Sequence, residues 1–166
     1  MMAEQHDLAG AICALGQELT SEHAAGRLPV LLVHVRGTSQ ALHPLVRDAV
    51  FGIAGEALRN AFHHAGAKQI EVELCHHPRQ LRLRVRDDGK GIDPELLRLG
   101  RSRHFGLRGM SEHAARLGGK LAVWSRLDAG TEVELSIPRS HAYSSPSPPR
   151  SWLGQKVFGE NETSDR

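Results

Sequence analysis

The sequence has few cysteines and few aromatic residues. It holds two cysteines, Cys13 and Cys75, among 166 residues, and aromatic residues make up 4% of the chain. Two cysteines so far apart do not form a disulfide framework, so we expect both to be reduced and buried as small hydrophobic side chains. Reduced cysteines are typical of a cytoplasmic protein. Because aromatic residues are scarce, the core must be largely aliphatic.

Long hydrophobic runs and clusters of basic residues are also missing. No apolar run approaches the roughly 18 residues of a membrane-spanning helix, and the N-terminus lacks a signal-peptide pattern. We therefore expect no membrane contact by this chain, although a longer parent protein could be anchored in the inner membrane. The formal net charge is +2, and the basic residues are scattered, without interleaved aromatic residues. This pattern excludes nucleic acid as the expected partner.

The length suits one domain with an appendage. Residues 1–27 have hydrophobic residues at helical spacing and are expected to form an amphipathic lead-in helix. Residues 28–138 alternate between helical and strand patterns and form the expected domain. Residues 139–166 are rich in serine and proline and poor in aliphatic residues. We expect this last segment to be a disordered tail.

The hydrophobic pattern of the domain predicts an α+β fold. A long central helix is expected to begin at Pro44 and to end near Ala65, just before Gly66. A second helix is expected over 105–117, and a short one after Ile92. Alternating or β-branched runs predict five strands, at 29–36, 69–75, 80–86, 121–124 and 131–137. Together they predict a two-layer α/β sandwich, a mixed sheet of about five strands with helices packed on one face.

One face of the central helix carries polar side chains that could bind a ligand. Glu56, Asn60, His63 and His64 share one arc of the helix, whereas the opposite arc is aliphatic. We expect a carboxylate, a carboxamide and two imidazoles to make a poor solvated surface when no lysine or arginine neutralises them. Oxygen donors of this kind suit a hydrated cation such as Mg²⁺ together with an anionic ligand.

Two glycine-containing segments lie farther along the chain. Asp87 ends a strand and is followed by Gly89 and Gly91, a spacing that allows positive φ and close approach to a planar ligand. The carboxylate could accept a hydrogen bond from an exocyclic amine such as that of adenine. Gly106 and Gly109 open a helix whose free amides could hold phosphate oxygens. Positive charge lies just upstream, at Arg98, Arg101, Arg103 and His104.

Each segment alone is a weak signal, but their order along the chain is specific. From His43 to Pro138 the chain resembles the ATP-binding catalytic domain of sensor histidine kinases. These belong to the GHKL superfamily that includes DNA gyrase and Hsp90. The closest resemblance is to the short-lid type paired with response regulators that carry helix-turn-helix outputs. The resemblance implies the Bergerat form of the α/β sandwich, ATP and Mg²⁺ as cofactors, and transfer of the γ-phosphoryl group to a histidine.

The resemblance also implies roles for individual residues. Asn60 would bind Mg²⁺ through its side-chain oxygen, with Glu56 as a second candidate ligand. Glu56, Asn60 and His64 would be the catalytic residues, and Asp87 would hold the adenine amine with support from Thr131. The implied nucleotide-binding residues are Asn60, His63, His64, Asp87, Gly89, Gly91, Ile92, Arg103, His104, Gly106, Leu107, Gly109 and Thr131.

The sequence departs from the family pattern at two positions. Arg103 stands where short-lid members often have glycine, so it could stiffen the lid or contact a phosphate. Asp88 stands where asparagine is also common, and we expect it to add negative charge near the base.

No segment with a phosphoacceptor histidine and its usual neighbours can be found. We therefore expect the partner to be a histidine-bearing dimerisation domain of the same parent kinase, with a response regulator served indirectly. Because kinase dimerisation usually resides in that other segment, the chain is expected to be a monomer.

Two alternatives share the same fold. One is a free-standing serine kinase that resembles the anti-sigma factors, although these would usually begin directly with the first strand. The other is a docking module that keeps the fold without binding nucleotide. A phosphorylation assay with a histidine acceptor and a serine acceptor would separate the three.

Overall fold

The structure is a computed structural model that describes residues 7–23, 26–98 and 106–144. It contains a five-stranded sheet in the order β1-β2-β3-β5-β4. β1 and β2 are parallel and the other neighbouring pairs are antiparallel. The sheet is therefore mixed, as the sequence predicted. The strands are β1 (Val30–Gly37), β2 (Gln69–His77), β3 (Gln80–Asp87), β4 (Lys120–Arg126) and β5 (Gly130–Pro138).

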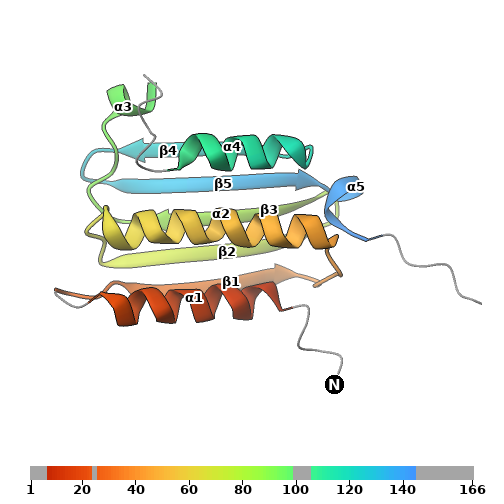
Figure 1. The fold of residues 1–166 in the computed structure, drawn as a ribbon, viewed down its shortest axis with the longest axis horizontal. Coiled ribbons are helices and arrows are strands. Elements are labelled where there is room, and N and C mark those ends of the chain that lie inside the picture. The colour runs from red at the N-terminus through yellow and green to blue at the C-terminus, as the bar shows by residue number, and fades with distance from the viewer. Residues whose placement is uncertain (1–6, 24–25, 99–105, 145–166) are drawn as a thin grey trace, which may run out of the picture.

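The described helices are α1 (Leu8–Glu22), α2 (Pro44–His63), α3 (Pro94–Arg98), α4 (Leu107–Arg116) and α5 (Arg139–Ala142). Of these, α1, α2 and α4 cover one face of the sheet (Figure 1). α1 packs on α2 and β1, α2 on β3, and α4 on β4. The predicted two-layer α+β sandwich is confirmed. α2 begins at Pro44 as expected and ends at His63, two residues earlier than expected, before Gly66 with φ +59°.

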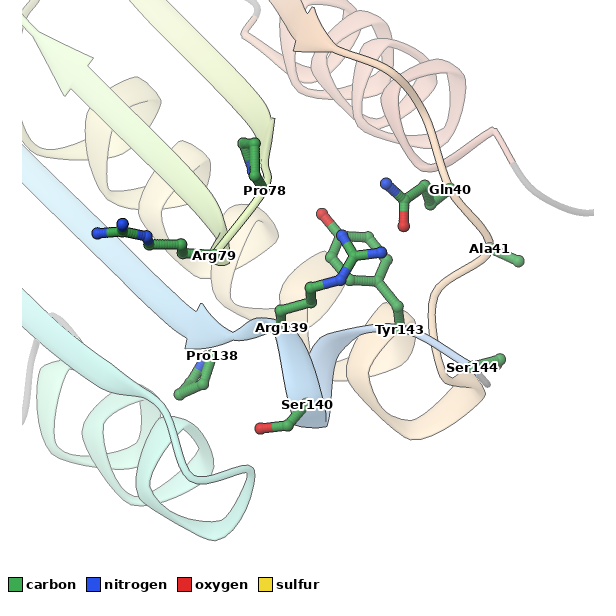
Figure 2. Close-up of a pocket in the computed structure, with 9 residues that line it drawn as sticks. All are labelled: Gln40, Ala41, Pro78, Arg79, Pro138, Arg139, Ser140, Tyr143 and Ser144. Carbon is green, nitrogen blue, oxygen red and sulfur yellow. The ribbon is translucent and has the colours of Figure 1, made fainter. Parts of the chain in front are cut away.

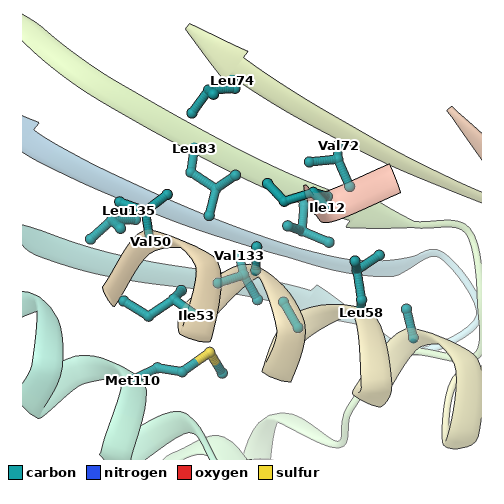
Figure 3. Packing of buried hydrophobic residues seen from close by; sticks show 14 of the residues in the cluster. Ile12, Val50, Ile53, Leu58, Val72, Leu74, Leu83, Met110, Val133 and Leu135 are labelled. Atoms are coloured by element: carbon teal, nitrogen blue, oxygen red, sulfur yellow. The ribbon is translucent and has the colours of Figure 1, made fainter. Parts of the chain in front are cut away.

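The core lies between the sheet and the helices and is aliphatic (Figure 3). Alternation along β2 and β3 turns every second side chain toward the helices, so Val72 and Leu83 are almost fully buried. From the helix layer, Ile53 and Leu58 of α2 are about 1% exposed or less. Met110 of α4 belongs to the same core (Figure 3). Burial of these side chains fixes which face of α2 remains available for a site.

The open face of the sheet is polar, but Glu73 on this face is buried. Alternation along β2 predicts a solvated side chain at this position, whereas the side chain of Glu73 is 5% exposed. Arg36 of β1 and Arg82 and Arg84 of β3 lie within 2.6, 3.5 and 3.4 Å of its carboxylate. Glu73 is buried because β2 is an inner strand, so that long side chains of both neighbouring strands close over it.

The ordered fold extends beyond the boundaries expected from composition. Ile12 of the lead-in helix is fully buried against α2 and β1, so α1 is part of the domain. At the other end the chain continues past Pro138 into α5, where Ala142 is fully buried and Tyr143 pairs with Leu42. The first six residues of the expected tail therefore belong to the fold, and 145–166 lie outside the described residues. Both cysteines are free and only partly buried.

Candidate functional site

The exposed side of α2 lies between two glycine-containing segments. Near the end of α2, the Asp87 turn contacts the chain at Ala65, whose carbonyl accepts a hydrogen bond from the Lys90 amide at 2.8 Å. At Glu56 the same helix contacts Gly106, the residue that caps α4. Nine residues separate Ala65 from Glu56, which is roughly 13 Å along a helix. The three predicted segments thus meet along one wall, over a length suited to an extended nucleoside triphosphate.

Glu56 and Asn60 lie one turn apart on α2, and both are partly buried. Glu56 forms an ion pair with Arg59 at 3.3 Å, so the expectation that this face has no basic partner is wrong. Gly106 has φ +62°, and a Cβ added there would lie 2.6 Å from Oε1 of Glu56. The absence of a side chain at position 106 therefore lets the first turn of α4 approach the carboxylate of α2. A Cβ at Gly109, in that same turn, would meet nothing within 4 Å.

Asp87 ends β3 in a buried position, with 7% of its surface exposed. The backbone amide of Gly89 donates to its Oδ1 at 2.9 Å, and the Thr131 amide also donates to the carboxyl. Burial raises the pKa of Asp87, and the two amide hydrogen bonds partly offset this effect. A buried carboxyl held in place by backbone amides can accept a hydrogen bond from a ligand amine without reorganising.

The two glycines of this turn are required by neighbouring backbone. A Cβ at Gly89 would lie 2.3 Å from the Ala65 carbonyl oxygen, and one at Gly91 would lie 2.1 Å from that of Arg126. Only Gly91 of the two has positive φ, at +70°. Both glycines therefore allow the turn to pack between α2 and β4. Their expected contact with the base stays a prediction.

Asp88, the second aspartate of this turn, binds the protein backbone. Its Oδ1 accepts hydrogen bonds from the amides of Lys68 and Gln69, at 2.8 and 2.9 Å. The Gln69 hydrogen bond is the largest cause of a lowered pKa for Asp88. The carboxylate thus holds the connection between α2 and β2. The negative charge that we expect Asp88 to add near the base stays a prediction.

Sequence reasoning missed Ser125, which joins the Asp87 turn to β5. Its Oγ accepts a hydrogen bond from the Ile92 amide at 2.7 Å and lies 2.8 Å from Oγ1 of Thr131. Thr131 is paired with Asp87 across β3 and β5, and with Ser125 across β4 and β5. The signal in the sequence was a lone hydroxyl in a mostly apolar strand segment.

Other predicted site residues lie around this wall. Ile92 and Leu107 are both 8% exposed and belong to the core, so their side chains form its apolar margin. His63 and His64 are exposed at the end of α2, and the His63 ring lies 6.5 Å from that of His23. His63 therefore lies on the side of α2 that is near the end of α1. The predicted residues Arg103 and His104, and Arg101 beside them, lie outside the described residues.

The donor set fits a magnesium ion that keeps most of its water. The described residues contain no group of three or more His, Cys, Asp or Glu that could enclose a metal. Asn60 and Glu56 offer one or two oxygen donors, and Mg²⁺ is commonly held in this way together with ligand phosphates. The expected Mg²⁺ role of Asn60 is compatible with its placement.

A large cavity lies at the opposite end of the sheet. It measures about 890 Å³ and is lined by residues of the β2–β3 turn, α5 and the loop before α2 (Figure 2). Arg139 lies over the ring of Tyr143 at 5.4 Å from its centroid. β3 begins beside this cavity and ends at Asp87. The cavity therefore has no part in the site built on α2.

Two smaller hollows, of about 250 and 360 Å³, border Asp87. Both are also lined by Arg86, which alternates with the core residues of β3. They therefore open on the sheet face that carries no helix, behind the α2 wall. Within the described residues, no helix has the length and apolarity needed to cross a membrane.

Known proteins are similar to this chain in sequence and in fold. Residues 46–141 match the family described as histidine kinase-, DNA gyrase B- and HSP90-like ATPase. The sensor histidine kinase LiaS of Bacillus subtilis is 38% identical over 93 residues, which cover 56% of this chain and 25% of that protein. The histidine-protein kinase/phosphatase DegS of the same organism is 30% identical over 122 residues, covering 73% of this chain and 32% of DegS.

A solved structure shows the same fold. The histidine kinase domain of the blue-light activated histidine kinase from Erythrobacter litoralis EL346 superposes with a TM-score of 0.65 at 22% identity. The match covers 80% of this chain and 65% of that one. The chain spans about a quarter to a third of the length of the two curated relatives described above.

Proposed function

The chain belongs to the family of histidine kinase-, DNA gyrase B- and HSP90-like ATPases, and from this membership we propose that it is the ATP-binding catalytic domain of a two-component sensor histidine kinase. The observation that carries the proposal is the convergence on α2. Glu56 contacts Gly106, the capping residue of α4, while Ala65 contacts the turn that holds Asp87. A nucleotide lying along this wall would have an acceptor for its base at one end and helix amides for its phosphates at the other.

Each group would act mainly by position and charge. Asp87 would accept from the adenine amine, and the amides of the first turn of α4 would hold phosphate oxygens. Asn60 would bind Mg²⁺, which neutralises the charge of the phosphates. Glu56 would orient the attacking histidine or accept its proton. Phosphoryl transfer depends mainly on such in-line positioning and charge neutralisation, so no covalent enzyme intermediate at this wall is needed.

The proposed acceptor is a histidine on a dimerisation domain of the same parent kinase, from which a response regulator would receive the phosphoryl group. This chain spans only part of the relatives that it matches, so the assay must supply the acceptor. Labelled Mg·ATP would be incubated with the chain and a histidine-bearing dimerisation domain from a related kinase. In parallel, a small serine-bearing antagonist would test the anti-sigma-factor alternative. We expect an acid-labile label on the histidine protein only.

A matched pair of variants makes this assay specific. Asn60→Ala should remove transfer and the tightening of ATP binding by Mg²⁺, measured by calorimetry with and without the metal. Gln40→Ala removes a carboxamide from the cavity at the opposite end of the sheet and should change neither. An acid-stable label on serine would favour the alternative. Absence of ATP binding by the parent chain would leave only a docking module.

A further inference from the structure

Ser125 makes three hydrogen-bonded contacts beside the turn that holds Asp87. The Ile92 amide donates to its Oγ at 2.7 Å, and the Ser125 hydroxyl donates to the Gly130 carbonyl at 3.1 Å. Its third contact is with the hydroxyl oxygen of Thr131 at 2.8 Å. Ser125 therefore connects the segment after Gly91 to the start of β5.

The number of hydrogen bonds that a hydroxyl can donate and accept decides which of the two hydroxyls, Ser125 or Thr131, is the donor in the third contact. A serine hydroxyl has one proton to donate and two lone pairs that accept. Ser125 directs its proton to the Gly130 carbonyl and uses one lone pair for the Ile92 amide. Its second lone pair is satisfied when the Thr131 hydroxyl donates to it. In this arrangement, which satisfies all three contacts at once, Thr131 presents only lone pairs to any further neighbour.

The Asp87 side chain is likewise a hydrogen-bond acceptor and not a donor. It is paired with Thr131 across the sheet, and its carboxyl accepts from the amides of Gly89 and Thr131. An ionised carboxylate has no proton to donate. Asp87 and Thr131 together form a corner of the site that can accept hydrogen bonds and cannot donate them from its side chains.

We propose that Ser125 is a specificity-determining residue: by accepting the hydrogen bond of the Thr131 hydroxyl, it keeps this corner acceptor-only and so selects a 6-amino purine against a 6-oxo purine. The inference rests on the proposed function, because it requires the base to lie at Asp87. A 6-amino group donates to both acceptors, whether directly or through water. A 6-oxo group would face them with lone pairs, which leaves buried acceptors unpaired.

The test compares ADP with inosine diphosphate, in which a 6-oxo group replaces the amine. Both would be titrated by calorimetry into the parent chain and into Ser125→Ala, Ser125→Thr and Ser21→Ala. The Ser21 hydroxyl donates to a backbone carbonyl of α1 at 2.9 Å and serves as the matched control. We expect the preference for ADP to fall about tenfold in Ser125→Ala, the effect of one hydrogen bond. Ser125→Thr keeps the hydroxyl and should retain the preference, as should Ser21→Ala.

Equal losses of affinity for both nucleotides in Ser125→Ala would show that the residue only supports the fold, and would overturn the inference. If that variant melts too early to titrate, Ser125→Cys replaces it, because a thiol is a weak hydrogen-bonding group of similar size. A preference unchanged from the parent would overturn the inference there too. If the parent chain binds neither nucleotide, the proposed function itself fails, which is a different result from an unaltered preference.

Discussion

At the scale of single residues, Asp87 and Asp88 show how environment separates two identical side chains. Asp87 is buried, and its pKa is raised by that burial. Asp88 is exposed, and hydrogen bonds from backbone amides lower its pKa. Ionised Asp87 therefore lowers the stability of the folded protein, whereas Asp88 stabilises the loop that it binds. A residue retained at such a cost is a candidate for function.

Replacing Asp87 with asparagine should separate binding from stability. Asp87→Asn should weaken ADP binding by about 100-fold, because the ligand amine loses a charged acceptor. The free energy of unfolding should stay equal or rise by up to about 1 kcal/mol at neutral pH, because a buried charge is removed. Calorimetry and urea unfolding measure the two quantities. Unchanged ADP affinity would contradict the assignment of Asp87.

The pH dependence of the two aspartates should be opposite. Because the folded pKa of Asp87 is raised, its contribution is present below the usual aspartate pKa and is lost as pH rises through the raised value. The advantage of Asp87→Asn should therefore grow with pH. For Asp88 the folded pKa is lowered, so its contribution is present above the usual value and is lost on acidification. Asp88→Asn should be the less stable protein at neutral pH, with ADP affinity nearly unchanged, and the difference should shrink in acid.

At the scale of elements, alanine should have opposite effects on stability at the two glycines that open α4. Gly106→Ala would put a methyl group against Glu56 in a residue of positive φ, and should lower the free energy of unfolding by about 1–3 kcal/mol. Gly109→Ala enters open space within a helix and should raise it by up to about 1 kcal/mol. Thermal melts measure both effects.

Both variants should nevertheless bind ATP more weakly than the parent chain. Both place a methyl group where the proposed phosphates would approach α4, so both should weaken ATP binding. If Gly109→Ala is more stable and binds ATP as tightly as the parent, the phosphates do not lie at this turn.

The packing of α5 on the sheet should be sensitive to pH. His76 of β2 lies 3.2 Å from the Tyr143 hydroxyl, and burial lowers the pKa of its imidazole. The stability that this residue contributes is therefore present above the usual histidine pKa and is lost as pH falls through the lowered value. The parent chain should lose more stability than His76→Gln between pH 7 and pH 5. Urea unfolding of both proteins at several pH values measures this, and equal losses would contradict it.

At the scale of the whole molecule, α1 completes the core. Ile12 is fully buried between α2 and the sheet, although composition alone placed the domain boundary after it. Ile12→Ala should lower the free energy of unfolding by about 2–4 kcal/mol. Leu45→Ala, at a position 66% exposed, should change it by no more than about 0.5 kcal/mol. Equal effects of the two variants would show that α1 is only a connection.

Much of the fold could be predicted because its signals are local. The alternation through Ile70, Val72 and Leu74 identifies an amphipathic strand, and Pro44 and Gly66 bracket the central helix. Likewise, Glu56 and Asn60 share a helix face at fixed spacing. Hence the layers, most strand positions and the side of α2 that carries the site followed from the chain itself.

The tertiary structure alone decided what each polar group contacts. The sequence could not show that Glu73 is buried under arginines from two strands, that Asp88 binds the amides of Lys68 and Gln69, or that Ser125 lies beside Thr131. Periodicity reports which way a side chain points relative to its own element. The partners of these groups come from other elements, and only the packing of the sheet sets the distances between them. The elements and their faces therefore follow from local patterns in the chain, whereas packing sets which charges are buried and which hydrogen bonds align the site.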